Sequence, residues 1–366
     1  MRLDRLTLRN FRNYREQSMD FQDGVNILVG QNAQGKTNIL ESIFLLTGSR
    51  SWRAGRKSEL VRFGSESACI EASLFSRGRG FDVRMTLPAA GRGLCTVNGV
   101  KTKKQSQLSD VLRCVLFAPE DLSLLRDGAA ARRRFLDTAL CQLRPRYAEL
   151  LGEYQRLIEH KTRLLRAEEG REGMLAVLPD FDARIVAVGA AVIGYRARFI
   201  ECLAPVCQSI YRDISGGREQ LCMRYSTLST IENPTAPQKE LEQAFFRHLY
   251  SHREAELRLG QCLSGPHKDD LVMEIDGRPC RAFASQGQTR SAALAMKFAE
   301  REIFFRDSGE YPILLLDDVL SELDVSRQTD VVEHTPGGQA IITCCEDTGR
   351  FSTGGRRLRV ENGKVW

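Results

Sequence analysis

The sequence predicts an α/β protein with a mixed sheet and surrounding helices, joined to a mainly helical second lobe. A glycine-rich loop lies between a short apolar strand and a helix near the amino terminus, and a buried strand near the carboxyl terminus ends in two acids. The segment between them, from 129 to about 259, has a mostly helical hydrophobic period. Residues 1–119 with 311–366 are therefore expected to form one lobe, and residues 120–310 the other.

The glycine-rich loop is Gly30-Gln31-Asn32-Ala33-Gln34-Gly35-Lys36-Thr37, which matches the pattern G-x-x-x-x-G-K-[ST]. In such a loop, backbone N–H groups surround phosphate oxygens, Lys36 reaches the β- and γ-phosphates, and the Thr37 hydroxyl binds Mg²⁺. An ordinary glycine-rich turn is the alternative. The apolar run 25–29 before the loop and the helical pattern after it favour binding of ATP or GTP.

The remaining pattern of the first lobe is mostly strands. Residues 2–9 alternate apolar and charged side chains, and the other expected strands are 17–21, 67–75, 81–87, 93–97 and 112–117. Asn98-Gly99 predicts a type I′ hairpin turn. The basic loop 50–57 is expected near the nucleotide. The candidate contacts to DNA phosphate are Arg50, Arg53, Lys101, Lys103 and Lys104, and a solvated charged surface is the alternative.

In the middle of the chain, apolar residues from 143 to 164 keep a four-three spacing, which favours a short helical hairpin. Residues 168–173 are the expected connection, and Asp180 is the expected cap of the next helix. Residues 271–275 and 279–283 predict a second hairpin. Near the carboxyl terminus, 339–343 is expected to be a core strand, followed by a polar tail.

The buried strand 312–316 runs into Asp317-Asp318, a Walker B pattern. The carboxyl end of such a strand lies at the edge where open α/β sheets bind ligands. Asp317 is therefore expected to hold Mg²⁺, and Asp318 to orient or deprotonate the attacking water, with Lys36 as the third catalytic group. Thr37 and Asp317 lie 280 residues apart, whereas Ras-like GTPases and small-molecule kinases place these motifs much closer together.

Two further motifs flank this strand. Ser285-Gln286-Gly287-Gln288 precedes an expected helix at 289–305 and resembles the signature motif of ABC ATPases. Its hydroxyl, small backbone and helix dipole suit a γ-phosphate. Residues 321–324 resemble the D-loop of the same proteins.

Taken in order, the motifs of nearly the whole chain resemble those of the RecF family, bacterial recombinational-repair ATPases related to SMC proteins. The matching segments are 8–14, 32–38, 118–122, 132–137, 265–270, 285–288 and 316–324. The pair Asp317-Asp318 also resembles RecF, because ABC and SMC ATPases generally have Asp-Glu there. One departure is Trp52, where RecF relatives commonly have histidine.

The resemblance implies an ABC/SMC-type P-loop ATPase head that uses ATP and Mg²⁺. It also implies an ATP-dependent homodimer, in which Ser285, Gly287 and Gln288 of one protomer contact the γ-phosphate bound by the other. The implied task is to bind single-strand gaps or junctions in DNA and to help RecO and RecR load RecA, which is needed for SOS induction. A weak DNA-stimulated ATP hydrolysis would then release the protein.

The composition limits which other classes of protein and binding site the chain can represent. The formal net charge of +6 fits a nucleic-acid partner, and the eleven cysteines lack zinc-like spacing, so buried reduced thiols are expected. Apolar runs are too short for a membrane span and a signal peptide is not apparent, so a cytoplasmic location is expected. The alternative functions are the ATPase subunit of an ABC transporter and a P-loop metabolic phosphotransferase.

Overall fold

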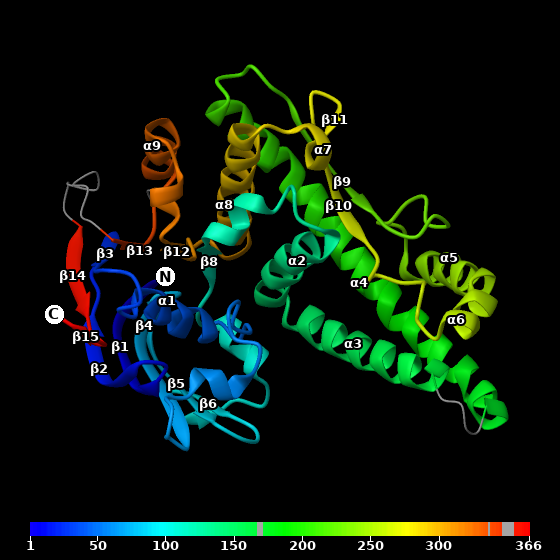
Figure 1. Cartoon of the computed structure of the whole chain (residues 1–366), viewed down its shortest axis with the longest axis horizontal. Helices are drawn as coiled ribbons and strands as arrows, with labels where there is room; N and C mark the ends of the chain where they lie inside the picture. Colours follow the sequence, from blue (N-terminus) through cyan, green and yellow to red (C-terminus); the bar gives the residue numbers. More distant parts are fainter. Residues whose placement is uncertain (167–170, 336, 346–354) are drawn as a thin grey trace. The chain divides into compact units, whose positions relative to one another are not determined.

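The computed structural model describes residues 1–166, 171–335, 337–345 and 355–366. The chain divides into two compact units (Figure 1). The first comprises 1–123, 213–216 and 286–366, and the second comprises 124–212 and 217–285. The main division therefore falls at 285/286 rather than at the expected 310/311, because the helix 286–308 packs against the strand and the turn at 114–123 of the first unit.

The strands of the first unit are β1 (Arg2–Phe11), β2 (Tyr14–Asp20), β3 (Val25–Val29), β4 (Ser67–Ser76), β5 (Arg79–Pro88), β6 (Leu94–Val97), β7 (Val100–Lys101), β8 (Cys114–Phe117), β12 (Ile313–Asp317), β13 (Ala340–Cys344), β14 (Arg356–Glu361) and β15 (Lys364–Val365). Its helices are α1 (Lys36–Leu45), α8 (Gln286–Ser308) and α9 (Val325–His334), with short 3-10 helices η1 (Lys57–Leu60), η2 (Gln105–Asp110), η3 (Pro119–Ser123) and η4 (Val319–Glu322).

One sheet of the first unit is antiparallel, with the order β2-β1-β4-β5-β6-β7. Leu6 and Leu8 of β1 and Ile70 of β4 are fully buried, so the predicted alternation places one face of this sheet in the core. Asn98 and Gly99 have φ angles of 49° and 78°, which confirms the predicted type I′ turn between β6 and β7.

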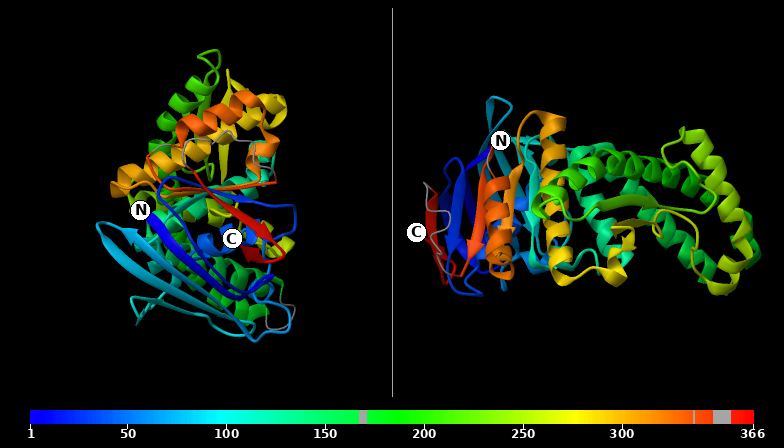
Figure 2. Two further views of the ribbon diagram at one scale, coloured as in Figure 1. Left: turned by 90° about the vertical axis from the view of Figure 1, so that its left-hand side faces the viewer. Right: turned by 90° about the horizontal axis from the view of Figure 1, so that it is seen from above.

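The other sheet has the order β15-β14-β3-β13-β12-β8, and every pairing in it is parallel except β14 with β15. The sequence predicts a polar tail at this end of the chain, and for residues 356–361 this expectation is wrong because they form β14, which pairs with β3. Leu358 and Val360 are buried while Arg357 and Arg359 are exposed, a short alternation that is hard to recognise in so charged a segment. The carboxyl-terminal end of the chain lies beside β2 (Figure 2). Gln17 Nε2 donates to the Val365 carbonyl at 3.1 Å.

The second unit contains α2 (Ala129–Leu143), α3 (Pro145–Arg166), most of α4 (Arg171–Ile214), α5 (Gln238–Ser251), α6 (Arg253–Leu259), α7 (Cys280–Phe283) and the antiparallel strands β9 (Leu221–Ser226), β10 (Asp270–Ile275) and β11 (Arg278–Pro279). Within the described part of the chain, no helix is both long and apolar enough to cross a membrane.

The region from 129 to about 259 is mostly helical, as expected, and the one strand described within it, β9, pairs along the full length of β10. Two other expectations for this unit are wrong. Residues 280–283 form a helical turn instead of a returning strand. α4 already begins at Arg171, so Asp180 lies inside it and caps nothing. Part of the expected connection, residues 168–170, lies outside the described residues.

Candidate nucleotide site

The order of the parallel sheet brings the two ends of the chain to one edge. β13 lies between β3 and β12, and all three strands run in the same direction. The glycine-rich loop after β3 and the acids after β12 therefore meet at their carboxyl ends, on either side of the end of β13. The Thr37 hydroxyl donates to Asp317 Oδ1 at 2.8 Å, which joins residues 280 positions apart.

Close neighbours explain both fixed glycines of the loop, side chains at Gly35 and backbone at Gly30. Gly35 has a φ angle of 115°, and a Cβ there would lie 2.7 Å from the Tyr14 hydroxyl. That hydroxyl donates to the Gly35 carbonyl at 3.1 Å, and Asn13 Nδ2 donates to the Gln34 carbonyl at 3.0 Å. The turn between β1 and β2 thus holds the loop, which gives a physical role to the RecF-like segment 8–14.

The carboxyl-terminal strands hold the other side of the loop. A Cβ at Gly30 would lie 2.1 Å from the carbonyl oxygen of Val360, so β14 leaves space only for glycine. The Asn362 N–H donates to Gln34 Oε1 at 2.6 Å. The loop is therefore supported by both ends of the chain, and the second support was absent from the sequence prediction.

Lys36 is only 3% exposed and lies across the loop. Its Nζ donates to the Gly30 carbonyl at 2.5 Å and lies 3.8 Å from Asp318 Oδ2. The Cys345 thiol lies 3.5 Å from the same Nζ. The structure thus places Lys36, Thr37, Asp317 and Asp318 in one site.

The two acids have different surroundings. Burial raises the pKa of Asp317 above its ordinary value, hydrogen bonds from Thr37 and Thr343 oppose that rise, and the nearby charge of Asp318 adds to it. Asp318 has a left-handed backbone, with a φ angle of 50°. Its buried Oδ1 has no hydrogen-bond partner among the described residues. An unpaired buried carboxylate oxygen beside the loop is suited to accept a hydrogen bond from a ligand or a water.

Thr343 is a residue of this site that the sequence analysis missed. The sequence predicts it only as the last residue of the core strand 339–343. Its hydroxyl donates to Asp317 Oδ1 at 3.0 Å and accepts the Asp318 N–H at 2.8 Å. The signal in the sequence was a hydroxyl residue at the carboxyl end of an otherwise apolar strand. That signal becomes informative only when the strand order places β13 next to β12.

The basic loop after α1 reaches the same site. Arg53 Nη1 donates to Asn38 Oδ1 at 3.0 Å, and its charge acts on Asp317. The loop is anchored through Glu41, a fully buried carboxylate that accepts Arg12 at 2.7 and 2.8 Å and the Ser51 hydroxyl at 2.5 Å. This confirms the expectation that the loop 50–57 lies near the nucleotide-binding edge.

Its neighbour Trp52 packs edge-on against Phe44, with ring centroids 5.5 Å apart. Trp52 therefore helps to hold the loop on α1.

The other basic candidates lie elsewhere in the first unit. Arg50 is exposed at the start of the loop, and Lys101, Lys103 and Lys104 are exposed in β7 and the turn after it, at the edge of the antiparallel sheet.

Gly287, in the signature motif, lies in the first turn of α8, and this turn is held by α9. Arg327 donates from Nη2 to the Gly287 carbonyl at 2.9 Å and from Nε to the Ser291 hydroxyl at 3.0 Å. Asp324, the last residue of the D-loop, caps α9 by accepting the Arg327 N–H at 3.1 Å. The signature and the D-loop are thus joined through one arginine. Ser285 itself is exposed, and Gln288 is partly exposed.

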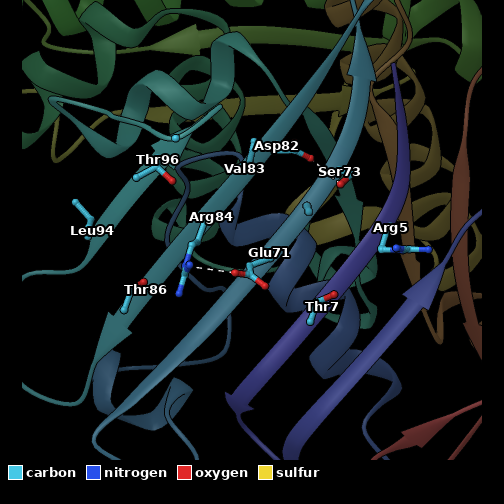
Figure 3. Close-up of a pocket in the computed structure, with 12 residues that line it drawn as sticks. Arg5, Thr7, Glu71, Ser73, Asp82, Val83, Arg84, Thr86, Leu94 and Thr96 are labelled. Atoms are coloured by element: carbon cyan, nitrogen blue, oxygen red, sulfur yellow. Dashed lines mark hydrogen bonds and ion pairs between the residues drawn. The ribbon is translucent and has the colours of Figure 1, made fainter.

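A separate depression of about 660 Å³ lies over the outward face of the antiparallel sheet (Figure 3). Several polar side chains on this face pair with one another. Arg84 lies 3.4 Å from Glu71, and the Ser73 hydroxyl donates to Asp82 at 2.7 Å. None of the residues that line it belongs to the nucleotide site.

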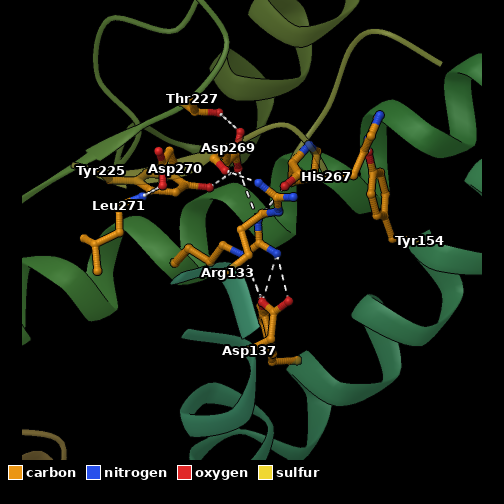
Figure 4. Close-up of polar contacts among 12 residues, drawn as sticks. Arg133, Asp137, Tyr154, Tyr225, Thr227, His267, Asp269, Asp270 and Leu271 are labelled. Carbon is orange, nitrogen blue, oxygen red and sulfur yellow. Dashed lines mark hydrogen bonds and ion pairs between the residues drawn. The ribbon is translucent and has the colours of Figure 1, made fainter. Parts of the chain in front are cut away.

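The second unit contains a buried polar cluster around Arg196, which we call the Arg196 cluster. Figure 4 labels its members Asp137, Tyr225, Thr227 and Asp269. The Arg196 guanidinium lies 2.9 Å from Asp137 and 3.3 Å from Asp269, and it donates to the Pro266 carbonyl at 2.6 Å. Asp269 also accepts the hydroxyls of Thr227 and Tyr225. Burial raises the pKa of Asp269, and the charge of Arg196 opposes this rise. The cluster fixes the RecF-like segment 265–270.

Comparison with known proteins agrees with this geometry. The model of the RecF/RecN/SMC N terminal domain matches residues 2–354. The DNA replication and repair protein RecF of Acetivibrio thermocellus is 34% identical over 372 residues, and that of Bacillus subtilis is 36% identical over 374 residues; both alignments cover 100% of this chain and of the relative.

A solved structure of the recombination mediator protein RecF, in a form named RecF-ATPrS, superimposes with a TM-score of 0.91 at 30% identity. It covers 99% of this chain and 97% of that one. The Smc head domain from Pyrococcus furiosus superimposes with a TM-score of 0.56 at 18% identity, a likeness of fold alone, over 100% of this chain and 95% of that one. These matches confirm the expected ABC/SMC-type head, and with the sequence matches they show that the chain belongs to the RecF family.

Proposed function

We propose that the first unit binds ATP and that the protein uses this ATP as a switch on DNA in the cytoplasm, in recombinational repair and replication restart. The observation that carries the proposal is the contact between Thr37 and Asp317, which completes a P-loop and Walker B site from the two ends of the chain. The similar structures named RecF-ATP and RecF-ATPrS support ATP as the nucleotide.

The residues present fit Mg²⁺ as the metal. The Thr37 hydroxyl and the Asp317 carboxylate are hard oxygen donors 2.8 Å apart, the ligand type that Mg²⁺ prefers. When bound, the metal would neutralise charge on the phosphates. Lys36 would contact the β- and γ-phosphates, and the loop from Gly30 to Gly35 would surround them with backbone N–H groups. Asp318 would orient the attacking water and accept its proton through a carboxylate that the protein leaves partly unpaired.

The remaining γ-phosphate contacts would come from Ser285, Gly287 and Gln288 of a second protomer. Gly287 lies at the amino-terminal end of a 23-residue helix, whose dipole favours an anion there. A phosphate shared across an interface gives ATP a higher affinity for the dimer than for the monomer, and hydrolysis removes that contact. The dimer would therefore form with ATP and separate after slow hydrolysis.

DNA would contact exposed basic side chains, with Arg50, Arg53, Lys101, Lys103 and Lys104 as the proposed phosphate ligands. Arg53 also acts on the charge of Asp317, which would couple DNA contact to hydrolysis and make the ATPase DNA-stimulated. The proposed targets are single-strand gaps and junctions. The proposed task is to help RecO and RecR load RecA, which is needed for SOS induction. The solved relative named as part of the RecFOR pathway supports these partners.

The test is ATP-dependent retention of the protein on gapped duplex DNA at increasing salt. Wild type is expected to dimerise with ATP, to bind with little sequence preference, and to lose affinity steeply with salt. Lys36→Arg should impair ATP binding or turnover. Ser285→Arg should keep ATP binding but block dimerisation. A Ser285→Arg protein that still dimerises with ATP would show that the composite site is wrong, and retention independent of ATP would exclude the switch.

A further inference from the structure

We infer that Thr343 is the positioning residue of the hydrolytic site, because one hydroxyl holds the metal-binding acid and the water-orienting acid in their relative places. This inference rests on the proposed ATPase function. Thr343 itself would not touch the nucleotide, and it would act entirely through Asp317 and Asp318. None of the motifs that indicated the nucleotide site includes it.

The position of Thr343 follows from the order of the strands. β13 lies between the strand that precedes the glycine-rich loop and the strand that precedes the acids. In the parallel register, Thr343 pairs with Asp317 on one side and with Leu28 on the other. Its side chain is fully buried, so the hydroxyl must find its partners within the protein.

The directions of the two hydrogen bonds are determined by their partners. The Asp318 N–H can only donate, so Thr343 Oγ1 accepts from it at 2.8 Å. The hydroxyl proton is then directed to Asp317 Oδ1, 3.0 Å away. Thr37 donates to the same Oδ1 at 2.8 Å, so two hydroxyls converge on one oxygen of that carboxylate. The carboxylate is thus oriented from the P-loop side and from the β13 side.

The bond to Asp318 holds a backbone conformation that is unfavourable for a non-glycine residue. Asp318 has φ 50° and ψ 15°, a left-handed conformation that residues other than glycine adopt only rarely. Its N–H would be an unpaired donor in the core without Thr343. The hydrogen bond therefore stabilises the turn that directs the Asp318 carboxylate toward Lys36, with Oδ2 3.8 Å from Nζ. Losing it would free both acids to move.

The experiment compares Thr343→Val, which keeps the shape but removes the hydroxyl, with Thr343→Ser, which keeps the hydroxyl. Turnover of Thr343→Val is expected to fall roughly 10- to 100-fold, the usual effect of losing a hydrogen bond that orients a metal-binding carboxylate. Its affinity for ATP without metal should stay within about twofold of wild type, while the gain in affinity on adding Mg²⁺ should shrink. Both quantities can be followed with a fluorescent ATP analogue.

Thr335→Val is the matched control. Thr335 is a buried threonine of the same unit, whose hydroxyl bonds to its own helix at the Val331 carbonyl, 2.6 Å away. This variant should keep wild-type turnover and Mg²⁺ dependence, and Thr343→Ser should recover most of both. If Thr343→Val matches wild type in turnover and Mg²⁺ dependence, or if Thr343→Ser fails as badly as Thr343→Val, the positioning role is wrong. If wild type does not bind ATP, the proposed function fails instead.

Discussion

The nucleotide site of the first unit and the Arg196 cluster of the second are both built from charged side chains below the surface, yet they use them differently. In the Arg196 cluster, Asp137 and Asp269 both face the same guanidinium, and hydroxyls complete the set. In the nucleotide site, a buried oxygen of Asp318 has no partner among the described residues, and Lys36 is held by backbone carbonyls instead of a close ion pair.

This difference indicates that the Arg196 cluster serves the fold and the nucleotide site serves ligand binding. A saturated buried network stabilises one conformation, and removing a member leaves an uncompensated charge. An unsaturated site costs stability but leaves donors and acceptors for a ligand. Substitutions in the Arg196 cluster should therefore lower the free energy of unfolding, whereas substitutions in the nucleotide site should lower ATP turnover.

The largest effect is expected for Asp318→Asn. Loss of the carboxylate that is proposed to orient the water should reduce ATP turnover roughly 100- to 10,000-fold while ATP still binds. Stability should stay equal or rise, because asparagine accepts a left-handed backbone and carries no buried charge. Steady-state ATPase assays and thermal unfolding measure both. Asp20→Asn, at an exposed ion pair with Arg5, is the control and should change neither. A large loss of stability in Asp318→Asn would show that the nucleotide site, like the Arg196 cluster, stabilises the fold.

Arg196→Met should lower stability and leave ATP binding unchanged, whereas Asp318→Asn should lower turnover and keep stability. Removing this guanidinium leaves Asp137 and Asp269 without their cation, and it is expected to lower the free energy of unfolding by about 3–5 kcal/mol. ATP affinity should be unchanged at temperatures where the variant is folded. Arg198→Met removes an exposed arginine of the same helix, whose guanidinium lies 5.8 Å from the Tyr195 ring, and should cost less than about 1 kcal/mol. If urea unfolding shows that Arg196→Met and Arg198→Met lose the same free energy of unfolding, the cluster does not stabilise the fold.

A smaller effect is expected in the pH dependence of stability, through His267. Burial lowers the pKa of His267 to about 4, from an ordinary value of 6.5. Between these values the unfolded chain binds a proton that the folded chain does not. The contribution of His267 to stability is therefore fully present above pH 6.5 and is lost as the pH falls toward 4. Its Nδ1 lies 2.6 Å from the Tyr154 hydroxyl, and Nε2 lies 3.1 Å from the Cys262 carbonyl, a pair of partners that a neutral ring satisfies.

The measurement is the free energy of unfolding of wild type and His267→Asn from pH 4 to 7. The wild type should lose more stability on acidification across this range than the variant does. Identical slopes for the two proteins, or an NMR titration of His267 near its ordinary pKa, would contradict the assignment.

Much of the first unit could be predicted because its signals are local. The glycine-rich loop lies between a strand and a helix, Asn98-Gly99 requires a type I′ turn, and apolar residues lead directly into Asp317. Each of these depends on neighbours in the sequence. The fold class and the RecF-like motif order followed from them, and the comparisons confirm both.

The expectations that were wrong concern segments whose structure depends on distant partners. β14 is rich in arginine and was expected to be a tail, but its pairing with β3 makes it a strand. β9 lies within a region of mostly helical period, and its side chains Leu221, Met223 and Tyr225 alternate with the others where it pairs with β10. α4 continues through Asp180 although that residue is a favourable cap, so local preference did not decide where the helix begins.

The sequence by itself determined the chemistry of the nucleotide site, because the residue types that bind phosphate and metal are encoded in two short segments, Gly30 to Thr37 and Asp317-Asp318. The tertiary structure alone decided what surrounds them. The order of the parallel strands placed β13 between the two motifs, which brought Thr343 to both acids, and placed Val360 against Gly30. Strand order is set by burial of the whole sheet, so no short segment of the sequence contains it.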